Sequence, residues 1–176
     1  MQGPRLGSLI SAIAGLIFVL VNAGAFGGPL DVVLRVLGVV VFAAVIWFAV
    51  LRRAAGRPGP EPSPGALRTY LICVGGEVVA IPLGAQLLIR VLDRPQLTPV
   101  WVVLVVGVHF LPFARAFRVP LFRTLGWTLV GLALLGGVLA LTLTPLAVPG
   151  AAVAAGFVLL AFAALGATRP GTVPNG

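Results

Sequence analysis

The stretch Tyr70–Phe117, "YLICVGGEVVAIPLGAQLLIRVLDRPQLTPVWVVLVVGVHFLPFARAF", consists of two apolar runs joined by a short polar segment. The apolar runs belong to two predicted spans, residues 68–90 and 97–115, and each span matches the roughly 20 residues that a helix needs to cross a bilayer. The segment between them, "RVLDRPQLTP" (90–99), carries the charges and prolines that end helices. The stretch therefore predicts two antiparallel transmembrane helices.

The rest of the chain has the same character. Apolar residues make up 60% of it and charged residues 9%, and its mean hydropathy is +1.15, which a water-soluble domain of 176 residues could not enclose in one core. We predict an all-α polytopic bundle that forms a single transmembrane domain over residues 1–176. Its proline- and glycine-rich segment 52–68 is interpreted as a linker. The six predicted spans are 6–26, 30–51, 68–90, 97–115, 121–143 and 147–167.

Arginine supplies all twelve basic residues, against four acidic ones, for a formal charge of +8. The arginines lie between the apolar runs, so they indicate membrane topology and not a nucleic-acid partner. Those that favour a cytoplasmic position are Arg5, Arg52, Arg53, Arg57, Arg68, Arg115, Arg118, Arg123 and Arg169. We therefore expect both termini to be cytoplasmic and the chain to be a multi-pass protein of the inner (plasma) membrane. Arg90 and Arg94 depart from this pattern, with Asp93 as partial compensation.

A competing interpretation concerns the N-terminus. Arg5, the apolar run that follows it and the small residues Ala23–Ala25 imitate a signal peptide with a cleavage site. The apolar run is long for a signal peptide, so we expect the first helix to be retained.

Two ionisable side chains lie deep in the predicted spans, where they are costly unless they are paired or face a cavity. Glu77 is about nine residues from the cytoplasmic end of its helix, and the chain's single histidine, His109, is about six residues from the same side, which gives depths of ~13 and ~9 Å. Antiparallel helices joined by a short loop are usually neighbours. The sequence therefore predicts contact between Glu77 and His109.

Small residues and prolines surround this pair. Gly76, Ala80 and Gly84 recur at four-residue spacing and would allow another backbone to approach closely. Pro82 and Pro112 each remove a helix hydrogen bond near the polar residue, which is tolerated beside a cavity. The alternative is that the Glu77 and His109 pair only locks two helices together.

A second group of polar side chains is expected at the outer side of the bundle. Asp31 and Arg35 are four residues apart on one helix and can pair. We expect them to meet the polar residues at the ends of neighbouring helices, namely Asn22, Gln86, Arg90, Asp93 and Arg94. They are either interfacial ion pairs or part of a binding site.

We predict Glu77 and His109 as the catalytic pair. Aromatic residues near His109 could line a cavity, and Arg115 either anchors its helix at the headgroups or closes the pocket against an anionic group. The candidate substrate-contacting residues are Asp31, Arg35, Phe110, Phe113, Arg115 and Trp127. The sequence contains no motif for a metal or a cofactor, and we predict neither.

The stretch "GVHFLPFARAF", which begins at Gly107, resembles a group of small multi-helix bacterial integral membrane proteins of uncharacterised function with the motif Gly-x-His-Phe-x-Pro-x-Ala-Arg. The resemblance covers about residues 75–120 and implies membrane insertion but no activity. In size, helix number and intramembrane acids the chain is also similar to membrane-bound terpene cyclases. That similarity implies acid-initiated cyclisation of a lipophilic substrate. The use of arginine alone as the basic residue looks like that of a high-GC bacterium.

Three functions follow from these features. A cyclase would use Glu77, kept neutral out of water, to protonate a prenyl chain, with His109 orienting the proton and aromatic faces stabilising the carbocation. A proton-coupled carrier or channel would use the same pair as a proton relay. With six helices and no visible repeat, it would either form a homo-oligomer or be an unusual transporter. An accessory subunit would use the pair for packing alone. The cyclase is favoured because an acid, an imidazole and many aromatic rings suit an apolar substrate, and the predicted partners are membrane lipid and a lipophilic small molecule.

Overall fold

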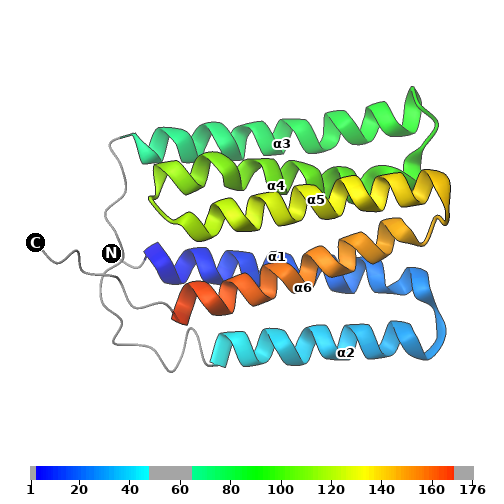
Figure 1. Ribbon diagram of the computed structural model, residues 1–176, viewed down its shortest axis with the longest axis horizontal. Coiled ribbons are helices and arrows are strands. Elements are labelled where there is room, and N and C mark those ends of the chain that lie inside the picture. The colour runs from blue at the N-terminus through cyan, green and yellow to red at the C-terminus, as the bar shows by residue number, and fades with distance from the viewer. Residues whose placement is uncertain (1–2, 48–64, 169–176) are drawn as a thin grey trace, which may run out of the picture.

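The computed structural model describes residues 3–47 and 65–168, and these ranges contain helices and no strand (Figure 1). In chain order the helices are α1 (Gly3–Ala23), η1 (Gly24–Phe26), α2 (Gly28–Val45), α3 (Ala66–Arg90), η3 (Pro95–Leu97), α4 (Thr98–Ala116), α5 (Pro120–Thr142) and α6 (Ala147–Thr168). Six of them are long and apolar enough to cross a membrane, so the predicted all-α fold with six candidate spans is confirmed. The end of the predicted second span, at 48–51, and the arginines Arg52, Arg53, Arg57 and Arg169 lie outside the described residues.

The α1–α2, α3–α4 and α4–α5 connections are short, and each contains or adjoins residues with a positive φ angle. Gly27 and Gly28 have φ angles of 64° and 53° where the chain turns into α2. L side chains rarely adopt such angles, which is why glycine suits this turn. Asp93 and Arg118 also have positive φ, at 50° and 54°, in the α3–α4 and α4–α5 connections. These tight turns place consecutive helices antiparallel to each other.

The contacts between helices give the spatial order α3, α4, α5, α6, α1, α2, and α1 and α6 overlap in the view of Figure 1. Helix α6 is the most central, because it contacts α1, α2, α4 and α5. Helices α2 and α3 form the two opposite edges. The start of α1 and the end of α6 lie at the same end of the bundle as the start of α3 and the end of α4.

Glycines allow the inner helices to approach closely. A Cβ atom added to Gly15 of α1 would lie 2.6 Å from the carbonyl oxygen of Gly156 of α6, and the reverse distance is also 2.6 Å. Between α4 and α5, a Cβ on Gly126 would lie 2.8 Å from the carbonyl oxygen of Gly107. Such small-residue contacts are typical of helices packed within a bilayer, where apolar burial gives no preference for a neighbouring helix over lipid.

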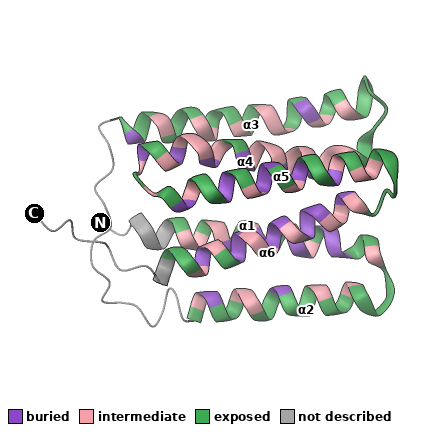
Figure 2. Ribbon diagram, in the orientation of Figure 1, coloured by how far each residue is buried: buried purple, intermediate pink, exposed green. Residues whose placement is uncertain are grey.

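Burial is concentrated in the inner helices (Figure 2). The main core joins α4, α5 and α6 around Val103, Leu125, Leu129 and Leu159. The edge helices instead present large apolar side chains outward; on α3 only Ala66 and Gly84 are buried. An apolar surface of this extent does not suit water and fits a multi-pass membrane protein.

The structure corrects one expectation about the outer polar group. Asp31 and Arg35 pair with each other on α2, as expected. However, α2 and α3 are at opposite edges of the bundle, so the pair does not meet Gln86 or Arg90 of α3. Asn22 of α1 instead donates a hydrogen bond to the carbonyl oxygen of Phe18, at 2.9 Å, within its own helix.

Candidate functional site

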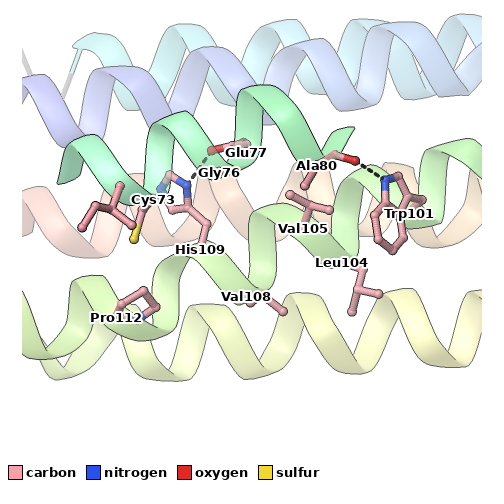
Figure 3. Close-up of a pocket in the computed structure, with 11 residues that line it drawn as sticks. Cys73, Gly76, Glu77, Ala80, Trp101, Leu104, Val105, Val108, His109 and Pro112 are labelled. Carbon is pink, nitrogen blue, oxygen red and sulfur yellow. Dashed lines mark hydrogen bonds and ion pairs between the residues drawn. The ribbon is translucent and has the colours of Figure 1, made fainter. Parts of the chain in front are cut away.

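Glu77 of α3 and His109 of α4 meet at the interface between these helices, as their similar predicted depths indicated (Figure 3). The distance from Glu77 Oε2 to His109 Nδ1 is 2.5 Å. The carboxyl oxygen does not complete a hydrogen bond of good geometry with the ring, and the buried Nδ1 has no other hydrogen-bond partner among residues 3–47 and 65–168. The two side chains therefore make a close carboxyl–imidazole contact.

Aromatic rings of α4 pack against the imidazole ring of His109. The centroid of Phe113 lies 4.3 Å from that of His109, and the centroid of Phe110 lies 5.2 Å away in an edge-on arrangement. Both phenylalanines are buried in the core of the bundle, and Phe110 also contacts Phe122 of α5. These contacts fix the orientation of the ring. The side chain of His109 is 14% exposed and that of Glu77 is 24% exposed, so the pair can still be reached from one side.

That accessible side is a groove of about 440 Å³ between α3 and α4 (Figure 3). Apart from Glu77 and His109, it is lined almost entirely by apolar or small residues, which are Ile72, Cys73, Gly76, Ala80, Trp101, Leu104, Val105, Val108 and Pro112. Ile72 and Val108 are 62% and 51% exposed, so the groove opens on the outside of the bundle. A single acid–imidazole pair therefore lies in an apolar groove that faces outward from two neighbouring helices.

Trp101 closes the end of the groove away from His109. Its indole Nε1 donates a hydrogen bond to the carbonyl oxygen of Ala80, at 3.1 Å, and its ring packs on Gly84. A Cβ on Gly84 would lie 2.1 Å from the ring, so Gly84 accommodates the indole and not a second backbone. The pairing of a large residue on one helix with a glycine on its neighbour was the signal that could have placed it in the groove.

Two further groove residues were not predicted. Cys73 lies one turn before Glu77 on α3 and lines the groove beside His109 (Figure 3). Gly76 also lines it, and neither Gly76 nor Gly75 has any atom within 4 Å of the position that a Cβ would occupy. The small residues of this part of α3 are therefore not required for packing within the described part of the chain.

The remaining predicted site residues are distributed over the bundle. Phe110 and Phe113 contact His109 but do not line the groove. Asp31 and Arg35 lie on the opposite edge helix, and Trp127 is 57% exposed on α5. Arg115 is exposed near the end of α4, one turn beyond the groove residue Pro112.

Comparisons with known protein families, with curated proteins and with solved structures give no match. The function of the site therefore has to be argued from its own geometry.

Proposed function

We propose that the chain is an integral membrane enzyme that protonates a lipophilic, prenyl-type substrate through Glu77, as a terpene cyclase does. The observation that carries the proposal is the contact between Glu77 and His109 in an apolar groove that opens outward from the bundle. A substrate dissolved in the bilayer could enter this groove laterally. It would then lie against the acid–imidazole pair without crossing water.

The surroundings of the pair support an acid role. Out of water, a carboxylic acid beside a neutral imidazole avoids the cost of separated charges. Glu77 would transfer its proton to an alkene carbon of the substrate, which leaves a carboxylate and a tertiary carbocation. Attack by a second alkene of the same chain forms the ring, and loss of a carbon-bound proton back to Glu77 gives a cyclic isomer of the substrate. Trp101, which lines the groove, offers a π face to the cation.

The distribution of arginine supports a topology for this enzyme. Arg68, Arg115, Arg118 and Arg123 lie at one end of α3, α4 and α5, the end at which α1 starts and α6 finishes. By the positive-inside rule, this end and both termini face the cytoplasm of a cell with the protein in its plasma membrane. Fusions of a reporter active only in the cytoplasm would be active at the α4–α5 connection and inactive at the α3–α4 connection.

The test of the proposed function is turnover by purified protein in lipid nanodiscs supplied with prenyl-chain substrates. Glu77→Gln keeps the shape of the side chain but removes the acidic proton, so we expect turnover to fall by ~10²–10⁴-fold, the usual contribution of a general acid. Asp93→Asn is the matched control, because it makes the same change in the α3–α4 loop and asparagine tolerates the positive φ of that position. Normal turnover by a correctly folded Glu77→Gln protein would refute the proposal.

An accessory subunit is the second candidate, and a specific observation favours it. Gly75 and Gly76 have open space beside them on an edge helix whose main helical neighbour is α4. A transmembrane helix of another protein could pack there, with the Glu77 and His109 pair serving only to join α3 and α4. Replacing both with glutamine would then leave cellular function intact, while Gly75→Leu would abolish co-purification of the partner. A carrier is less favoured, because the pair lies beside an edge helix and not among the inner helices.

A further inference from the structure

We propose that the groove binds a single-chain lipid phosphate, with the phosphate between Arg68 and Arg115 and the apolar chain running past Glu77 and His109 toward Trp101. This inference rests on the proposed function and names its substrate class. It adds Arg68 to the site and gives Arg115 a defined ligand.

The helical register places both arginines at the same end of the groove. Arg68 is four residues before Ile72 on α3, and Arg115 is seven residues after Val108 on α4. Residues four or seven apart share a helix face, so each arginine extends a face that lines the groove. Because α3 and α4 are antiparallel, the two arginines flank the groove end opposite Trp101.

The charges at this end are uncompensated among the described residues. Arg68 and Arg115 are exposed, and neither has an ion pair or a side-chain hydrogen bond in that part of the chain. Of the described acids, Asp31 and Asp93 lie at the other end of the bundle, and Glu77 contacts His109. Two free guanidinium groups, each with a fork of N–H donors, are well suited to the oxygens of one phosphate.

The dimensions favour one chain that reaches the acid. Arg68 lies nine residues from Glu77 and Arg115 six from His109, which puts the pair ~13 and ~9 Å from the arginines along the helix axes. A phosphate held by the arginines would therefore leave an inner segment of its chain beside Glu77. The groove volume of about 440 Å³ is near the lower end of the ~300–1,000 Å³ of ligand pockets, which fits one hydrocarbon chain better than two.

Cys73 provides a direct probe, because it lines the groove and is the chain's one cysteine. The experiment measures the rate at which N-ethylmaleimide alkylates Cys73 of the full-length protein in an uncharged detergent, as a function of added ligand. We expect farnesyl phosphate to slow alkylation at concentrations at least about tenfold lower than farnesol, since tenfold corresponds to ~1.4 kcal/mol. Inorganic phosphate has no chain to fill the groove and should neither protect Cys73 nor displace farnesyl phosphate at equal concentration.

Variants locate the phosphate. Arg68→Gln and Arg115→Gln should each raise the half-protecting concentration of farnesyl phosphate by about tenfold without changing that of farnesol, and Arg115→Lys should restore part of the loss. Arg123→Gln is the matched control, because it removes a charge at the same end of the bundle from α5, which does not line the groove. Circular dichroism and gel filtration identify any variant that fails to fold, and the remaining single variant then tests the site.

Three results would overturn the inference. Equal protection of Cys73 by farnesol and farnesyl phosphate would show that the groove has no phosphate site. An equal rise in the half-protecting concentration in Arg123→Gln would show that the arginines attract the phosphate only through the general charge of this end of the bundle. Equal protection by phosphatidylglycerol would assign the groove to a two-chain membrane lipid. Binding is measured independently of turnover. Arginine-dependent protection of Cys73 in a protein that is inactive on every substrate would therefore refute the proposed enzymatic function but support the binding site.

Discussion

Gly84→Ala is expected to destabilise the α3–α4 pair through a single methyl group. The new Cβ would lie 2.1, 2.2 and 2.4 Å from Cε2, Nε1 and Cζ2 of Trp101. Carbon atoms in contact are normally ~3.5–4.0 Å apart, so the indole must move by more than about 1 Å. A shift of that size breaks the 3.1 Å hydrogen bond from Nε1 to the carbonyl oxygen of Ala80.

The energies can be compared term by term. Overpacking costs about 1–3 kcal/mol, and the lost hydrogen bond costs about 0.6–1.5 kcal/mol. Replacing a helical glycine with alanine by itself raises the free energy of unfolding by about 0.5–1 kcal/mol. The free energy of unfolding should therefore fall by about 2 kcal/mol, because the steric cost exceeds the gain in helix propensity.

The assay is reversible unfolding by sodium dodecyl sulfate in mixed micelles, followed by circular dichroism. Gly75→Ala on the same helix is the control, because nothing lies within 4 Å of its new Cβ and only the stabilising term should remain. In a Trp101→Ala background the clash is absent, so Gly84→Ala should become neutral or stabilising. Equal stability of Gly84→Ala and Gly75→Ala would refute the proposed packing of Trp101.

Three further predictions concern other parts of the bundle. Gly156→Val should destabilise the protein by at least ~3 kcal/mol in the same assay, because its Cβ would lie 2.6 Å from the backbone of α1. Gly137→Val is the control: nothing lies within 4 Å of its Cβ, so it should change stability by less than ~1 kcal/mol. Asp31→Asn should change stability by less than ~1 kcal/mol, since both members of its ion pair are partly exposed; a larger loss would show that the pair contributes more than an exposed ion pair does. Cys73 should react faster with a membrane-soluble maleimide than with a charged one in liposomes, and the reverse order would show that the groove faces water.

Much of the fold could be predicted because bilayer dimensions limit the possible elements. Apolar runs of about 20 residues bounded by proline, glycine and arginine fix the spans, and the structure places the six helices close to the predicted boundaries. The contact between Glu77 and His109 also followed from sequence, since two antiparallel helices joined by a short loop bring residues of similar depth together. The activity assigned to this pair remains a prediction.

The sequence alone determined the number of long apolar helices, the position of each polar side chain along its helix and the meeting of Glu77 with His109, because these depend on length, order and charge. Only the tertiary structure decided which way each helix turns and which helices are neighbours: Phe110 and Phe113 face the core, Val108 faces outward, and Asp31 is a full bundle width from α3. The physical reason is that lipid is as apolar as a protein core, so hydropathy does not distinguish the two faces of a transmembrane helix. Close contacts such as those of Trp101 with Gly84 and of Gly15 with Gly156 determine which face of each helix is buried, and they form only when the helices pack together.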